Sequence, residues 1–318
     1  LYFALAIYYQ EIDKEKSEKY YHLGNNETMK SLRYNSFNYQ KNIGEIIETY
    51  KERFALNTLE SKQGSNNVFI LGTPRSGTTL IESIIASNDE VKSGGELLSA
   101  NKLIQEFIDN RDKKEVKEFI TSFHEKYLGR TNYLRGNFKI IVDKLPENFL
   151  FLGYLVKLLP NSKIIRTFRD PWDVAISLYK QRYVTNIPFS ASFFNIGVFM
   201  SNFEAVNYFW NKELEGNDNI LDIYYEELVE NTEVYQKKIY NFLGLESEYS
   251  EDRRRSFFSQ TASIRQIGSP VHKKSIEKNE FVDHKNEFYD AFKMQRKYWE
   301  KRGIVPKNDE FFGYKLIE

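Results

Sequence analysis

The feature that most constrains the fold is a strand that turns directly into a helix. Val68 to Leu71 are apolar residues typical of a buried strand, and the turn GTPRSGTT then leads into an apolar helix from Leu80 to Ala86. A second such unit follows, with a strand at KIIRTF, a turn at RDPWD and a helical pattern in VAISLYKQRY. Another strand fits Ile220 to Tyr224. This alternation predicts an α/β fold with a parallel sheet flanked by helices on both faces.

The second turn also indicates where its helix begins. Asp170 is a residue type whose side chain caps helix N-termini, and Pro171 fits a first helical turn, where no backbone N–H is needed. Sheets of this kind bind their ligands beyond the carboxyl ends of the strands. Because both turns lie there, the sequence predicts a ligand site formed by GTPRSGTT and RDPWD.

The N-terminal region has a helical pattern of its own. Phe3 and Ala6, then Tyr20 and Leu23, recur at helical spacing around the polar break EIDKEK, which predicts a helical hairpin. The stretch FALAIYYQEIDKEKSEKYYHLGNNETMK resembles the final unit of a tetratricopeptide array, and we then expect earlier units to precede this chain. An ordinary helical hairpin that packs on the main domain is the alternative.

A linker follows this region. Another helix fits Tyr39 to Phe54, and the polar segment NTLESKQGSNN after it is typical of a connection between domains. We therefore predict two parts, a helical N-terminal segment at 1–60 and the α/β domain at 61–318.

Composition excludes several classes of function. The 318 residues contain 45 Lys plus Arg and 45 Asp plus Glu, so no net charge draws the chain to nucleic acid or to an anionic membrane. Cysteine is absent, which excludes disulfides, thiolate metal sites and cysteine nucleophiles. No apolar run approaches the roughly 20 residues of a membrane helix. We predict a cytoplasmic protein with no membrane span and no nucleic-acid partner.

The turn GTPRSGTT matches the frame of a nucleotide P-loop, but Thr78 stands where that loop has its lysine. ATPases and kinases use this lysine on the β- and γ-phosphates, so its loss argues against ATP chemistry. Gly72 and Gly77 still let the backbone wrap around an anion, and Arg75 adds a forked cation. A tight connection without a ligand is the alternative. The predicted anion site, which needs no metal, comprises Arg75, Ser76, Gly77, Thr78 and Thr79.

Two segments resemble those of a known enzyme family. The stretch ILGTPRSGTTLIESIIASNDEVKSGGE is similar to the 5′-phosphosulfate segment of sulfotransferases that use PAPS (adenosine 3′-phosphate 5′-phosphosulfate). The similarity is closest to the bacterial tetratricopeptide-linked group and the tyrosylprotein sulfotransferases. The stretch IIRTFRDPWDVAISLY resembles the family's 3′-phosphate segment, which implies that Arg169 and Ser177 hold that phosphate. The resemblance covers roughly Val68 to Ser275 and implies a P-loop-like fold.

The same resemblance implies which residues perform the transfer. The sequence GGE ends at Glu96, where the tyrosylprotein-type relatives carry their base. Lys144, in VDKLPEN, resembles the family lysine beside the scissile sulfate. Ser263, in TASIRQIGSPVHKKS, falls near the same sulfate, and Tyr225, in DIYYEELVEN, lines the nucleotide site or is a core tyrosine. The expected catalytic set is Arg75, Glu96, Lys144 and Ser263.

Some positions depart from the family's patterns. Other sulfotransferases use a histidine base, but His22, His124, His272 and His284 lie in no matching motif; His272 is the second choice because it follows Ser263. Ser99 replaces an arginine that holds an acidic peptide in the tyrosylprotein relatives, which leaves a tyrosine acceptor open. The related bacterial enzymes favour a glycine, a basic residue and a tryptophan where this chain has SIEKN. Contacts of Lys273 and Lys274 with the nucleotide therefore stay open.

We therefore predict a PAPS-dependent sulfotransferase that transfers a sulfuryl group to a hydroxyl of a protein, peptide or glycan and releases adenosine 3′,5′-bisphosphate. The N-terminal repeat implies contacts with other proteins. The alternatives are a non-catalytic interaction protein that binds a nucleotide, and a P-loop kinase, against which Thr78 argues.

Overall fold

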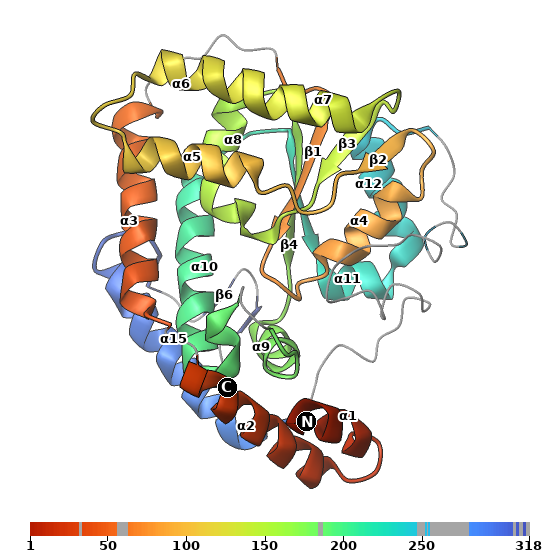
Figure 1. The fold of residues 1–318 in the computed structure, drawn as a ribbon, viewed down its shortest axis with the longest axis vertical. Helices are drawn as coiled ribbons and strands as arrows, with labels where there is room; N and C mark the ends of the chain where they lie inside the picture. Colours follow the sequence, from red (N-terminus) through yellow and green to blue (C-terminus); the bar gives the residue numbers. More distant parts are fainter. Residues whose placement is uncertain are drawn as a thin grey trace. The chain divides into compact units, whose positions relative to one another are not determined.

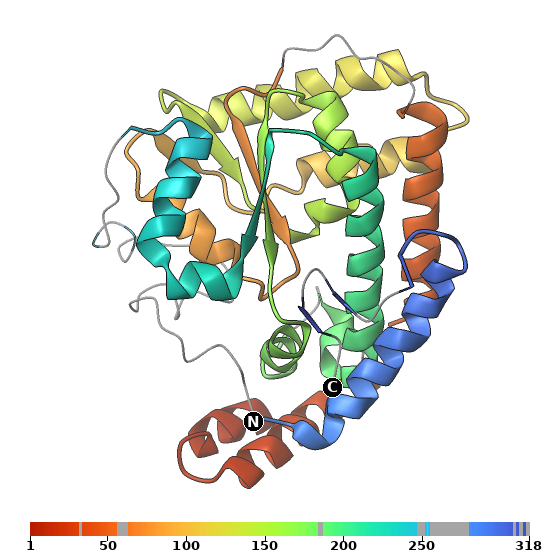
Figure 2. The same ribbon diagram turned by 180° about the vertical axis from the view of Figure 1, so that it is seen from behind.

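The computed structural model describes residues 1–31, 34–55, 63–183, 187–246, 252, 254, 280–307, 310–311 and 314–315. Figures 1 and 2 show the ribbon from two opposite sides. Within these ranges no helix is both long enough and apolar enough to cross a lipid bilayer. The predicted cytoplasmic location stays a prediction.

Contacts divide the chain into two compact units, each made of separate segments. The first unit takes its described residues from 1–41, 170–209 and 274–318, and the second from 42–169 and 210–273. The predicted boundary after residue 60 falls within 56–62, which lie outside the described residues. The division into 1–60 and 61–318 therefore stays a prediction.

The second unit is built on a five-stranded parallel sheet, which confirms the predicted α/β fold. Its strands are β1 (Asn67–Gly72), β2 (Val91–Ser93), β3 (Ile140–Asp143), β4 (Lys163–Phe168) and β5 (Ile220–Tyr224). Their order is β2-β3-β1-β4-β5, and every neighbouring pair is parallel. Strand β1 is central and entirely buried, as its apolar sequence predicts. The strands predicted in 68–71, 163–168 and 220–224 are confirmed, whereas β2 and β3 were not predicted.

One face of the sheet packs on aliphatic side chains. Helices α4 (Thr78–Ala86), α11 (Tyr225–Glu230) and α12 (Thr232–Leu243) cover this face, and Figures 1 and 2 agree on their side. Val68 and Ile70 of β1 belong to one buried cluster with Ile84 of α4 and Ile239 of α12. The apolar helix predicted from Leu80 to Ala86 is confirmed and begins two residues earlier.

Aromatic side chains pack on the other side of the sheet. Because side chains alternate along a strand, Phe69 points away from the cluster of Val68 and Ile70. Its ring stacks on that of Tyr127 at 5.9 Å, and Tyr127 stacks on Phe123 at 5.2 Å. The elements of this region are α5 (Ser99–Asp109), α6 (Val116–Phe123), the π-helical η1 (His124–Leu128), α7 (Gly129–Arg135), the 3-10 helix η2 (Pro146–Phe151) and α8 (Leu152–Leu158). Helix α3 (Ser36–Arg53) confirms the helix predicted over 39–54.

The first unit contains the predicted helical hairpin, formed by α1 (Tyr2–Tyr9) and α2 (Lys14–Ser31). The Ser17 hydroxyl donates to the carbonyl oxygen of Ala6 at 2.8 Å and ties the two helices together. A Cβ at Gly24 would lie 2.8 Å from the Phe3 ring, so glycine allows this ring to pack on α2. The hairpin is confirmed, and its resemblance to a tetratricopeptide unit stays a prediction.

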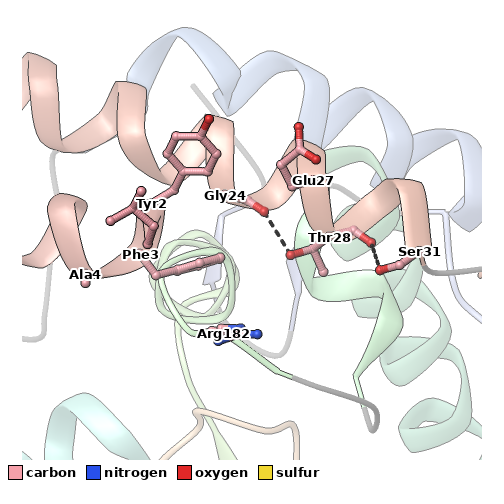
Figure 3. A pocket seen from close by; sticks show the side chains of 9 residues that line it. Tyr2, Phe3, Ala4, Gly24, Glu27, Thr28, Ser31 and Arg182 are labelled. Carbon is pink, nitrogen blue, oxygen red and sulfur yellow. Dashed lines mark hydrogen bonds between the residues drawn. The ribbon is translucent and has the colours of Figure 1, made fainter.

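A pocket of about 360 Å³ lies beside this hairpin (Figure 3). Figure 3 shows Phe3 on α1, Thr28 on α2 and Arg182 around it, with the Thr28 hydroxyl bonded to the Gly24 carbonyl. It is lined by Leu1, Tyr2, Phe3, Ala4, Gly24, Glu27, Thr28, Ser31 and Arg182.

The remaining elements of the first unit are mostly helical. They are α9 (Pro171–Tyr179), the 3-10 helix η3 (Pro188–Ala191), α10 (Phe193–Glu213, up to Phe209), the 3-10 helix η5 (Val282–His284), α15 (Lys285–Glu300), β6 (Glu310–Phe311) and β7 (Tyr314–Lys315). Asp170 accepts from the Asp173 amide at 2.9 Å with Pro171 in the first turn, which confirms the predicted start of α9. A buried ion pair of 3.2 Å joins Glu204 on α10 to Arg296 on α15.

Candidate active site

The turn between β1 and α4 depends on close packing at two glycines. A Cβ at Gly72 would lie 2.1 Å from Thr167 Oγ1 and 2.7 Å from the Thr167 carbonyl oxygen. Gly77 has a φ of 99° at the N-cap of α4, and a Cβ there would lie 2.5 Å from Tyr225 Cδ2. Only glycine allows both approaches, so the turn runs directly against β4 and α11.

Hydrogen bonds hold the tip of this turn in a tight conformation. The Ser76 amide and hydroxyl both donate to the Thr73 carbonyl oxygen, at 3.2 and 2.7 Å. The Ser76 hydroxyl also contacts Thr167 Oγ1. Arg75 has a φ of 72°, a left-handed conformation that is uncommon for residues other than glycine. Such strain recurs at functional sites, so an arginine at this position calls for a functional explanation.

The predicted arginine of the second turn lies beside the first turn. Arg169, immediately after β4, is buried, and its Nη1 donates to the Arg75 carbonyl oxygen at 2.9 Å. Its guanidinium lies 4.3 Å from the centre of the Tyr225 ring, a cation–π distance. The fold thus brings together Arg75, Gly77, Arg169 and Tyr225, which the sequence places on three separate segments. They lie at the carboxyl ends of β1, β4 and β5.

A carboxylate and an ammonium form a second cluster at the ends of β2 and β3. Lys144 follows β3 and is buried, and its Nζ lies 2.6 Å from Glu96 Oε1. The Glu96 side chain is 47% exposed. Backbone hydrogen bonds from Gly94 to Val142 and from Lys144 to Gly95 extend the pairing of the two strands into the GGE turn. The predicted base and the predicted lysine are therefore direct partners.

Two residues of this second cluster, Glu82 and Ser93, were not predicted from the sequence. Glu82 on α4 is completely buried, and its Oε2 lies 3.9 Å from Lys144 Nζ. Its Oε1 accepts a hydrogen bond of 2.6 Å from the Ser93 hydroxyl. Burial raises the pKa of the Glu82 carboxyl above its usual value, while Lys144 and Ser93 act to lower it. A lone acidic residue in the apolar helix sequence LIESIIA was the available signal.

A further buried carboxyl lies next to Lys144 in the chain. Asp143 accepts a hydrogen bond of 2.8 Å from the Tyr127 hydroxyl and one of 3.4 Å from the Leu97 amide. Burial raises the pKa of Asp143 to about 7, although these two hydrogen bonds favour its charged form. Burial thus favours the neutral form of this carboxyl, next to Lys144 in the chain.

The remaining site residues predicted from the sequence include two threonines, a serine and the histidines. Thr78 and Thr79 are the buried first residues of α4, and Ser177 is a buried residue of α9, which belongs to the first unit. His124 bonds the Leu158 carbonyl oxygen at 2.7 Å, which gives that ring a structural partner. His22 contacts the Tyr179 hydroxyl at 2.7 Å. Four predicted positions lie outside the described residues: Ser263, His272, Lys273 and Lys274.

This arrangement joins two chemical capacities in one unit. The amides that open α4 and the guanidinium of Arg75 suit an anion, because a helix N-terminus and a forked cation both favour negative charge. Glu96 offers a half-exposed carboxylate that can take a proton. Lys144 offers an ammonium that can neutralise developing charge.

Two known proteins resemble this chain over part of its length. The chain is 31% identical over 260 residues to an uncharacterized protein of Aquifex aeolicus, across 73% of this chain and 33% of that protein. It is 24% identical over 201 residues to a putative protein-tyrosine sulfotransferase of Caenorhabditis briggsae, across 58% of this chain and 66% of that protein. The chain thus spans less than two thirds of the length of either relative.

A solved structure and a family model also match this chain. The sulfotransferase domain of the Synechococcus PCC 7002 olefin synthase superposes with a TM-score of 0.46 at 18% identity, over 75% of this chain and 97% of that one. The model of the sulfotransferase family matches residues 67–251, which is more than half of this chain and includes both clusters described above. The chain belongs to the sulfotransferase family.

Proposed function

We propose that the protein transfers a sulfuryl group from PAPS to an acceptor hydroxyl. The observation that carries the proposal is the pairing of an anion-binding turn that lacks the P-loop lysine with the Glu96–Lys144 cluster in the same unit. Thr78 in the lysine position argues against a nucleotide kinase. The partnership of Glu96 with Lys144 favours an enzyme over an interaction protein that only holds a nucleotide.

Each residue receives a role from its chemistry. Arg75 and the amides from Ser76 to Thr79 bind the 5′-phosphosulfate, and Arg169, Ser177 and Tyr225 bind the remainder of the nucleotide. Glu96 takes the proton of the acceptor hydroxyl while the oxygen of that hydroxyl forms its bond to sulfur. Lys144 neutralises the charge that the bridging phosphate oxygen gains when its bond to sulfur breaks. Ser263 is assigned to the sulfate from its sequence motif alone.

The acceptor we propose is a hydroxyl on a protein, peptide or glycan. Support comes from the C. briggsae relative, which is described as a putative protein-tyrosine sulfotransferase. A tyrosine acceptor is one choice within this class, because Ser99 stands in place of the arginine expected for acidic peptides.

Thermal denaturation tests the proposed donor. A ligand that binds only the folded state stabilises it, by about 2.7 kcal/mol at a concentration of 100 times its Kd. We expect adenosine 3′,5′-bisphosphate to raise the melting temperature in the presence of EDTA, and ATP with magnesium to raise it much less. The reverse ranking would reject the proposal in favour of a kinase.

The 3′-phosphate assignment gives a selective prediction. Arg169→Ala and Ser177→Ala are each expected to remove most of the preference for adenosine 3′,5′-bisphosphate over adenosine 5′-phosphate, because a dianion loses a forked cation or a hydroxyl donor. Affinity for adenosine 5′-phosphate, measured by calorimetry, is expected to change little. Equal losses for both nucleotides would place these residues elsewhere in the site. Lys180→Ala is the matched control, since its Nζ pairs with Glu280.

A further inference from the structure

Glu82 is an unusual residue for its position. It is the only charged residue of α4, and it is 0% exposed. Burial of a carboxylate is costly unless it has charged or hydrogen-bonding partners. Its Oε1 has the Ser93 hydroxyl at 2.6 Å, whereas its Oε2 accepts no hydrogen bond within the described chain and faces Lys144 Nζ at 3.9 Å. The helix that follows the anion-binding turn therefore places a carboxylate next to the proposed catalytic lysine.

Lys144 thus lies between two carboxylates in different environments. Glu96 is half-exposed and bonds the ammonium at 2.6 Å, whereas Glu82 is buried and lies 3.9 Å away. In the proposed reaction Glu96 takes a proton and becomes neutral, so its attraction for the ammonium falls at that moment. A buried ammonium then needs another negative charge nearby, and Glu82 is fixed by its helix at that place.

Ser93 connects Glu82 to the turn that carries the proposed base. The Ser93 hydroxyl donates a hydrogen bond to Glu82 Oε1, and the same Oγ accepts a hydrogen bond of 3.2 Å from the Gly95 amide. Gly95 immediately precedes Glu96, and its carbonyl oxygen accepts the Lys144 amide at 2.9 Å. One chain of hydrogen bonds therefore runs from the helix of the anion-binding turn through Ser93 to Gly95, which precedes Glu96, and on to the Lys144 amide.

We infer that Glu82, through Ser93, is a positioning residue for the transfer reaction: it holds the Lys144 ammonium while Glu96 is protonated, and it fixes the turn that orients Glu96. The inference rests on the proposed function. In this role Glu82 acts through Lys144 and Ser93 and not directly on a substrate. Its loss is expected to slow the chemical step and to leave nucleotide binding almost unchanged, because Arg75 and Arg169 lie in the other cluster.

Three substitutions test this role against a merely structural one. Glu82→Gln keeps the size and removes the charge, and we expect kcat to fall about 10-fold while the affinity for adenosine 3′,5′-bisphosphate stays within about twofold. Glu82→Asp restores a charge and is expected to recover much of kcat. Ile85→Val is the matched control, since it removes a buried methyl group from the same helix without touching Lys144. Its kcat per folded molecule is expected to stay native.

The outcomes separate this inference from the proposed function. A native kcat in folded Glu82→Gln, or equal loss in the Gln and Asp variants, overturns the positioning role alone. A native protein that transfers no sulfate from PAPS to any hydroxyl overturns both. If Glu82→Gln does not fold, Ser93→Ala takes its place, because it breaks the same connection and leaves the buried charge present; a native kcat there overturns the inference as well.

Discussion

Arg75→Gly is expected to lower kcat/KM for sulfate transfer by about 10³-fold and to weaken PAPS binding, because it removes the forked cation of the anion-binding turn. Glycine is the replacement that least disturbs the backbone, since Arg75 has a φ of 72° and glycine adopts that conformation without strain. The turn is therefore expected to keep its shape, and the free energy of unfolding to stay native or to rise slightly. Calorimetry with PAPS and chemical denaturation measure the two effects independently.

Two further variants make the Arg75 result specific. Arg75→Ala removes the same cation but retains the strain of a side chain with positive φ, so it is expected to lose activity equally and to be less stable than Arg75→Gly. Arg75→Lys keeps a charge without the fork and is expected to lie between the native protein and Arg75→Gly. Unchanged PAPS affinity in a folded Arg75→Gly protein would mean that this turn does not bind the phosphosulfate.

Glu96→Gln is expected to lower kcat by about 10²-fold or more while PAPS still binds, because the amide keeps the size of the side chain but cannot take a proton. The partner atom makes this test stringent: glutamine retains a carbonyl oxygen that can accept from Lys144 Nζ, now 2.6 Å from the carboxylate. A loss of rate with this hydrogen bond retained therefore reports the lost charge and proton acceptance of the carboxylate, and not a lost contact. Single-turnover measurements with saturating PAPS separate this step from binding.

The histidine alternative supplies the control for Glu96. His272→Asn is expected to leave most of the activity, since His272 lies in no motif that matches a histidine base of the family. If Glu96→Gln transfers sulfate at the native rate while His272→Asn is inactive with PAPS bound, the base is His272 and not Glu96. A screen of hydroxyl compounds and tyrosine peptides with the native protein comes first, because both comparisons require an accepted substrate.

The local fold around the turn between β1 and α4 was predicted well from the sequence, for a physical reason. A tight strand-to-helix turn needs glycine where backbone or side chains approach closely, and Gly72 and Gly77 are in such places. Signals of this kind depend only on residues that are neighbours in the chain. Strand β1, helix α4 and the cap at Asp170 were therefore also predicted. The roles of Arg75, Arg169 and Glu96 in catalysis stay predictions until the variants are measured.

The strands β2 and β3 were not predicted, because each is short. β2 has three residues and β3 has four, too few for a pattern in the sequence to distinguish a strand from a loop. Their pairing nevertheless places Glu96 beside Lys144, 48 residues apart in the chain. A contact of this kind comes from sheet order and register, which a single sequence does not contain.

The amino-acid sequence by itself determined the α/β class, the turn that lacks the P-loop lysine and the residue types available for transfer chemistry, since these follow from local patterns and side-chain identity. Only the tertiary structure decided that the Arg169 guanidinium lies on the Tyr225 ring, that Lys144 lies between Glu82 and Glu96, and that Glu82 is buried. The reason is physical: an acidic residue in a helix is ordinarily solvated, and its burial depends on which strand passes beneath that helix.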